Sequence, residues 1–101
     1  MFVILRSEEF DAWLSALADI KGKARILARL RSAAFENFGD CEPVGEGVSE
    51  MRVHVGPGYR VYFMRTERSV YLLLTGGDKS TQSKDIVRAK IMARAIRENK
   101  P

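Results

Sequence analysis

The chain has 101 residues, with seventeen Lys or Arg against thirteen Asp or Glu, so its net charge at neutral pH is +4. This length fits a single domain over residues 1–101, and a 46% share of hydrophobic residues suits a folded core and excludes a disordered chain. One cysteine and one histidine exclude internal disulfides and multi-cysteine zinc sites.

The chain begins with an apolar run over residues 2–5 that favours a buried strand. Charged residues follow at once, so the start is unlike a signal peptide, and no apolar stretch is long enough to span a membrane. We therefore expect a cytoplasmic protein without membrane contact. Ser7 is expected to cap a helix over about 8–18, in which apolar core residues recur at helical spacing: Phe10, Trp13, Leu14 and Leu17.

A second helix is predicted near residues 23–37, after a break at Lys21-Gly22. Its apolar face contains Ile26, Leu27, Leu30 and Ala34. The basic residues Arg25 and Arg29 lie mostly on the other face, which is usually solvated but could also contact RNA or an acidic partner. Two helices joined by a short turn indicate a helical hairpin.

Residues 39–49 contain three glycines and a proline, which predicts a loop that could include a short extended piece. Alternating or apolar runs at residues 51–55, 59–64 and 70–75 then predict three antiparallel strands joined by short turns. Gly76-Gly77 is expected to end the last strand.

A final helix is predicted to start at a Ser80 or Ser83 cap and to bury an apolar stripe of Ile86, Ala89, Ala93 and Ile96. The predicted order is β-α-α-β-β-β-α, which makes the chain an α+β fold with an antiparallel sheet, an N-terminal helical hairpin and a C-terminal helix.

The strand pattern also predicts which side chains share a face of the sheet. If Val55 pairs with Tyr59 across the Gly56-Pro57-Gly58 turn, His54 lies opposite Arg60 and Arg52 lies opposite Tyr62. The next turn then places Thr75 beside Arg60. One face would be polar, and the other would collect the apolar residues Met51, Val53, Val61, Phe63, Leu72 and Leu74.

Charge blocks give this polar face a possible ligand. Residues 21–35 hold five basic residues and no acidic one, 36–50 hold five acidic residues, and 79–101 hold seven basic residues against two acidic ones. Lys79 and Lys84 follow the last strand and could join Arg52, His54 and Arg60 at an RNA phosphate, with Tyr62 stacking on a base. The alternative is an ordinary solvated sheet face.

Two sequence blocks carry a resemblance to a known family. The first runs Gly56-Pro57-Gly58-Tyr59-Arg60-Val61-Tyr62-Phe63, and the second runs Gly76-Gly77-Asp78-Lys79-Ser80-Thr81-Gln82. With the Phe10-Asp11-Ala12-Trp13-Leu14 segment, these blocks resemble the HigB-like "addiction module killer protein" branch of the RelE/ParE toxin superfamily. The resemblance implies the RelE-like fold and a toxin of a type II toxin–antitoxin module.

Members with ribonuclease activity enter the ribosome and cut mRNA without a metal or other cofactor, so the resemblance implies an mRNA interferase that inhibits translation. By position, Arg60 matches the family's sheet arginine, which stabilises the phosphorane charge. Arg52 and His54 match paired basic positions, and Lys79 matches a basic position after the last strand. Where some relatives carry Tyr or His, this chain has Lys84-Asp85, so His54, Asp85 and Tyr62 remain rival acid–base groups.

The resemblance also implies a partner, a small antitoxin that is often a helix-turn-helix protein. Two alternative functions stay open at this point. The superfamily contains ParE-like poisons of DNA gyrase, and the same basic face could belong to a non-catalytic module that binds RNA or the ribosome.

Overall fold

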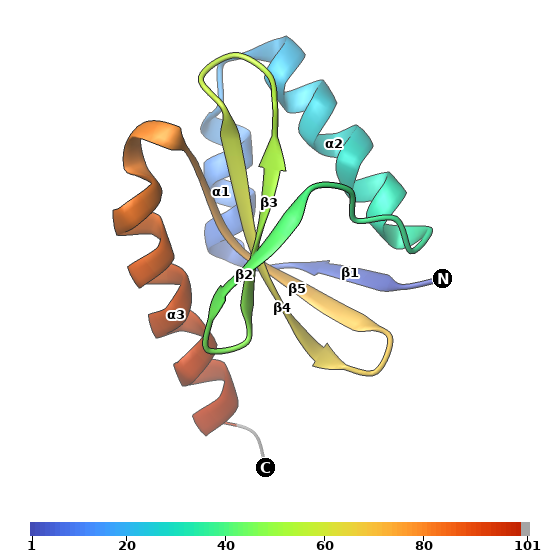
Figure 1. Ribbon diagram of the computed structural model, residues 1–101, viewed down its shortest axis with the longest axis vertical. Coiled ribbons are helices and arrows are strands. Elements are labelled where there is room, and N and C mark those ends of the chain that lie inside the picture. Colours follow the sequence, from blue (N-terminus) through green and yellow to red (C-terminus); the bar gives the residue numbers. More distant parts are fainter. Residues whose placement is uncertain (100–101) are drawn as a thin grey trace.

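The computed structural model describes residues 1–99; the last two residues of the expected domain lie outside this range. The five strands form one sheet in the order β1-β5-β4-β3-β2 (Figure 1). The α+β class and the predicted element order are confirmed, and a further strand adds to them. The elements are β1 (Val3–Arg6), α1 (Glu8–Ala16), α2 (Ile20–Ala34), β2 (Cys41–Gly45), β3 (Val48–Val53), β4 (Tyr59–Glu67), β5 (Val70–Asp78), the 3₁₀ turn η1 (Lys79–Thr81) and α3 (Gln82–Glu98).

The sheet is mixed because β1 runs parallel to β5, whereas the other neighbours are antiparallel. Val3 pairs with Val70 at the edge of the sheet, where Val3 and Leu5 stay about half exposed. The prediction of a buried first strand was therefore wrong, since β1 has a neighbouring strand on one side only. No helix within residues 1–99 is long and apolar enough to cross a membrane.

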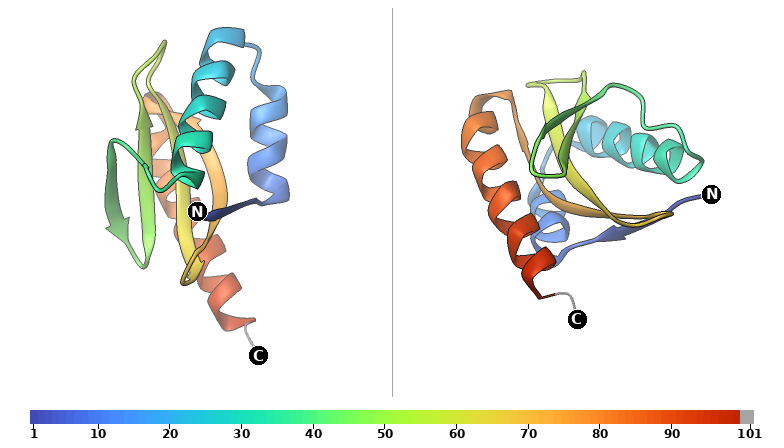
Figure 2. Two further views of the ribbon diagram at one scale, coloured as in Figure 1. Left: turned by 90° about the vertical axis from the view of Figure 1, so that its right-hand side faces the viewer. Right: turned by 60° about the horizontal axis from the view of Figure 1, so that its bottom comes forward.

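Helices cover both faces of the sheet, which the right panel of Figure 2 shows with α3 and α2 on opposite sides. Successive side chains of a strand point to opposite faces, so β4 contributes to two cores. One core joins α1 and α2 to the sheet through Phe10, Leu14, Ile26, Leu30, Met51, Val53, Val61, Phe63 and Leu73. The other joins α3 to the sheet through Val48, Tyr62, Met64, Leu74, Ala89 and Ala93. The prediction of one apolar and one polar face was wrong.

The helical hairpin is confirmed, with different bounds. Ser7 caps α1 as predicted, since its hydroxyl accepts a hydrogen bond from the Phe10 amide. Lys21-Gly22 does not form the break between the two helices as predicted. It lies in the first turn of α2, which Asp19 caps. Gly22 serves close packing: a Cβ there would lie 2.5 Å from the Tyr59 ring.

The segment predicted as a loop contains strand β2 and a tight turn into β3. Gly45, Glu46 and Gly47 all have positive φ, which makes the reversal possible. Short strands with few apolar residues leave little signal in a sequence, so the pattern indicated no more than a short extended piece where β2 lies.

The register of the meander differs from the predicted one by two residues. Val53 pairs with Tyr59, so Arg52 lies opposite Arg60 and Glu50 lies opposite Tyr62. His54 lies beyond the end of β3, and five residues rather than three separate the paired strands. Gly56 and Gly58 both have positive φ, which glycine adopts at little cost, and they allow the chain to reverse within this longer turn.

The β4–β5 pairing also differs from the predicted register. It shifts between Tyr62 and Phe63, so Thr75 lies beside Tyr62 and Gly77 lies beside Arg60. Because of this shift, Leu73 faces α1 and α2, whereas Leu72 and Leu74 pack on the α3 side.

Strand β5 continues through Gly76-Gly77 instead of ending there. An added Cβ would collide with the Trp13 ring at Gly76 and with the Asp85 carboxylate at Gly77, so the two glycines allow close packing of α1 and α3. Neither Ser80 nor Ser83 caps the helix that follows. Asp78 does so for η1, accepting a 2.8 Å hydrogen bond from the Ser80 amide. The apolar stripe of α3 is confirmed.

Candidate functional site

A hollow of about 430 Å³ lies between the β3–β4 turn and the end of β5. Figure 1 shows this turn at the top of the molecule. Its lining joins a glycine-containing turn to three cationic or ionisable side chains: His54, Val55, Gly56, Pro57, Gly58, Arg60 and Lys79. Gly58 lies next to two of them, because a Cβ there would be 3.7 Å from Arg60 Nη1 and 3.7 Å from Lys79 Cβ. The structure therefore brings together three of the four predicted catalytic residues.

Arg60 is the most buried of these side chains, with only 8% of the residue exposed. Its Nη1 makes one long contact of 3.5 Å to the Tyr59 carbonyl, and its Nε has no hydrogen-bond partner within residues 1–99. The Glu50 carboxylate lies 3.7 Å from that Nε and balances the buried charge. A buried guanidinium with unused donors can bind an anion strongly.

Arg52 does not reach the hollow, which corrects the prediction that it contacts phosphate there. Its guanidinium contacts three carboxylates, those of Glu42 at 2.6 Å, Glu50 at 3.2 Å and Asp40 at 3.5 Å. The hydrogen bond that Arg52 donates to Glu42, followed by the one that it donates to Glu50, raises the pKa of Arg52 above its usual range. The acidic segment 36–50 thus neutralises Arg52 instead of leaving it free.

His54 lies at the rim of the hollow with 68% of its side chain exposed. Its Nε2 is 2.6 Å from Asp40 Oδ2. This hydrogen bond is the main cause that lowers the pKa of Asp40. The contact orients the imidazole and leaves Nδ1 as its second functional nitrogen.

The two rivals of His54 lie elsewhere. Tyr62 is completely buried on the α3 side, so the prediction that it stacks on a base was wrong. Burial first, and then the negative charge of Glu50, raise the pKa of Tyr62. Asp85 accepts a 2.5 Å hydrogen bond from the Thr81 hydroxyl and packs against Gly77, away from the lining.

The remaining basic residues divide into exposed and structural ones. Lys79 and Lys84 are exposed, but Lys84 lies outside the lining of the hollow. Arg25 is exposed on α2, as predicted. Arg29 is less available to contact RNA, because its guanidinium donates hydrogen bonds to the main-chain carbonyls of Arg52 at 2.5 Å and Phe38 at 2.9 Å.

Glu50 and Gln82 are the residues that sequence reasoning missed. Glu50 is 1% exposed, contacts Arg52 and Arg60, and accepts a 2.8 Å hydrogen bond from Gln82. The position of Glu50 just before the alternating run that starts at Met51 was a signal for a polar residue on this strand. The predicted register differed by two residues from the observed one, so it did not place Glu50 near both Arg52 and Arg60. No group of three or more His, Cys, Asp or Glu side chains in residues 1–99 is placed to hold a metal ion.

The fold and this hollow define a class: an α+β domain whose mixed sheet ends in a cationic hollow beside a glycine-containing turn. No family model matches the chain. The chain is 47% identical over 87 residues to an uncharacterized protein of Haemophilus influenzae, a match that covers 86% of this chain and 88% of that protein. The chain belongs to the same family as this Haemophilus protein.

Proposed function

We propose that this protein is the toxin of a type II toxin–antitoxin module and cleaves mRNA on the ribosome in the cytoplasm. The observation that carries the proposal is the hollow that holds buried Arg60 with Lys79 and His54. A phosphodiester is an anion that such a hollow suits, and the exposed rim admits a single-stranded chain. The RelE-like resemblance of the blocks around Arg60 and Lys79 supports the same function.

In the proposed reaction, the ribose 2′-OH attacks its own phosphodiester. The O2′–P bond forms, the P–O5′ bond breaks, and the product is a 2′,3′-cyclic phosphate with a free 5′-OH. His54 Nδ1 accepts the 2′-OH proton while Asp40 holds Nε2 and stabilises the imidazolium. Arg60 and Lys79 stabilise the extra negative charge of the phosphorane, and the departing 5′ oxygen takes a proton from water.

The partner in this proposal is a small antitoxin of the helix-turn-helix type, which binds the toxin and silences it. Arg25 and Lys84 are exposed, so they can contact ribosomal RNA outside the hollow. Arg52 and Arg29 support the site by holding β3 and the acidic segment in place.

The test is cleavage of a defined mRNA by the purified protein, with and without ribosomes, followed by mapping of the new 5′ ends. We expect cuts that require ribosomes and carry 5′-hydroxyl ends. Arg60→Ala should lower the cleavage rate by about 100-fold or more, the typical effect of removing a donor at a developing oxyanion. His54→Ala should lower it as well, without changing the fold.

The matched control is Arg68→Ala, which removes an exposed arginine from the β4–β5 turn, far from the hollow. It should cleave like the unaltered protein. If both His54→Ala and Arg60→Ala keep full activity, the proposed site is wrong. If no RNA is cut but gyrase–DNA cleavage complexes accumulate, the protein is a ParE-like poison. Ribosome binding without either activity would indicate a non-catalytic module.

A further inference from the structure

The two edges of the sheet differ in how well they are protected against pairing with another chain. The β2 edge carries Pro43, which has no backbone N–H, and its pairing is irregular between Pro43 and Gly45. The β1 edge has no such device: it is regular over Val3–Arg6 and exposes Val3 by 51% and Leu5 by 48%. An open, apolar edge strand is a template for adding another strand.

The backbone of β1 shows which groups are free to accept such a strand. The amides of Val3 and Ser7 donate to the β5 side, to the carbonyls of Ser69 and Leu73. Backbone groups alternate along a strand, so those of Ile4 and Arg6 point to the opposite, open side. The Phe2 amide points the same way and bonds to the Ala34 carbonyl, at the end of α2.

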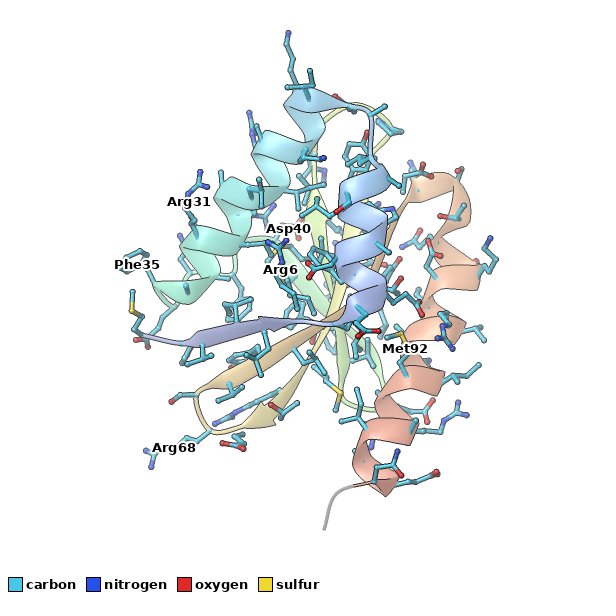
Figure 3. The ribbon with its side chains drawn as sticks, turned by 180° about the vertical axis from the view of Figure 1, so that it is seen from behind. Arg6, Arg31, Phe35, Asp40, Arg68 and Met92 are labelled. Carbon is cyan, nitrogen blue, oxygen red and sulfur yellow. The ribbon has the colours of Figure 1, made fainter. Side chains whose placement is uncertain are left out.

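A hollow of about 230 Å³ lies on this open side, between β1 and α2. Its floor is apolar and two arginines stand at its rim: Ile4, Leu27, Leu30, Ala34, Arg6 and Arg31. Phe35, which follows Ala34 at the end of α2, is 72% exposed. Figure 3 shows Arg31 on α2 and Phe35 at the end of this helix, with Arg6 between the two N-terminal helices.

We propose that this edge binds an extended, acidic and apolar segment of a partner protein, which adds to the sheet beside β1. Its backbone would pair with Ile4 and Arg6, and its apolar side chains would fill the hollow under α2. Helix α2 carries five basic residues and no acidic one, so it favours a negatively charged segment. This inference does not depend on the proposed ribonuclease activity.

The same charge disfavours a second copy of the chain as the occupant. Edge-to-edge pairing of two β1 strands would bring two α2 helices to one seam, each with five positive charges and no negative one. Arg6 is already paired with Asp11 at 2.6 Å, which holds its side chain away from the backbone edge. Arg31 is exposed and is the residue that the acidic segment would meet at the rim.

The test selects ligands from a phage-displayed library of random nonapeptides on the immobilised full chain. We expect enriched peptides that alternate apolar with acidic residues, and fluorescence anisotropy should measure their affinity. Arg31→Glu should weaken binding by about tenfold or more, because it places like charges together. Arg25→Glu makes the same charge change on the same helix, away from the hollow, and should alter affinity by less than about twofold.

Amide hydrogen exchange supplies a readout at the backbone itself. A bound peptide should slow the exchange of the Ile4 and Arg6 amides, because they become ladder donors. The proposal is overturned if no peptide is enriched, if the enriched peptides lack acidic residues, or if both arginine variants bind equally well. Concentration-dependent dimers in sedimentation that protect the same two amides would also overturn it, in favour of a second copy.

Discussion

The centre of the polar network is a single buried carboxylate. Glu50 lies directly next to two arginines that face each other across β3 and β4, Arg52 and Arg60. Like charges that are directly opposite destabilise a sheet, and a shared carboxylate removes that repulsion. Gln82 holds the second carboxylate oxygen from α3, so Glu50 also links the helix to the sheet.

We predict that Glu50→Gln lowers the free energy of unfolding by about 3 kcal/mol, because it leaves a buried arginine without its counter-ion. Glu42→Gln removes an exposed carboxylate from the same Arg52 and should cost less than about 1 kcal/mol. Urea denaturation of both variants measures the difference. Equal stabilities would show that Glu50 does not balance the buried charge.

At the scale of elements, Arg29 connects α2 to the strands that carry the site. Its guanidinium bonds to the Arg52 carbonyl in β3 and to the Phe38 carbonyl in the segment before β2. Two main-chain carbonyls from different segments are thereby satisfied by one helical side chain. The basic face of α2 therefore contains one structural arginine among exposed ones such as Arg25 and Arg31.

Arg29→Ala should lower the free energy of unfolding by about 2–3 kcal/mol, since it removes charge-assisted hydrogen bonds and leaves two carbonyls unpaired. Arg25→Ala should change it by no more than about 0.5 kcal/mol, as expected for an exposed helix position. Thermal and urea unfolding of both variants measure this difference in the free energy of unfolding. If Arg29→Ala leaves the free energy of unfolding unchanged, the two carbonyls accept hydrogen bonds from water in the variant and the prediction is wrong.

For the whole molecule, the acidic segment 36–50 is fastened to basic groups from distant parts of the chain. Asp40 contacts His54 and Arg52, and Glu46 pairs with Arg94 of α3 at 2.7 Å. The His54 hydrogen bond lowers the pKa of Asp40, and the Arg94 hydrogen bond lowers that of Glu46. Figure 1 shows this segment running from the end of α2 into β2, the edge strand of the sheet, and on into β3.

These depressed pKa values predict an acid-sensitive fold. At acidic pH the unfolded chain binds more protons at these carboxyls than the folded chain does, so stability rises with pH. The contribution is present above the unfolded values, near pH 4, and is lost as pH falls through the lower folded values. Tm should be nearly constant from about pH 7 to 5 and should fall below about pH 4. A constant Tm down to pH 3 would contradict this, and 1 M salt should weaken the effect by screening the exposed pairs.

The sequence by itself determined the element order, both N-terminal helices, the stripe of α3 and the candidates Arg60, His54 and Lys79. Helical periodicity and strand alternation are local properties, so a linear pattern reveals them. The pattern did not define β2 beyond a possible extended piece in a loop, because that strand is short, carries a proline and is largely exposed.

Tertiary structure alone decided which candidates meet. Residues Gly56 and Gly58 lengthen the turn after β3, and this two-residue difference in register moved His54 to a rim and brought Glu50 opposite Tyr62. The net charge of +4 indicated a polyanion, but only the folded chain shows that acidic residues surround Arg52, whereas Arg60 has the Glu50 carboxylate nearby and no hydrogen bond at its Nε within residues 1–99. Pairing across strands depends on turn geometry and on contacts between distant residues, which no local pattern in a sequence specifies.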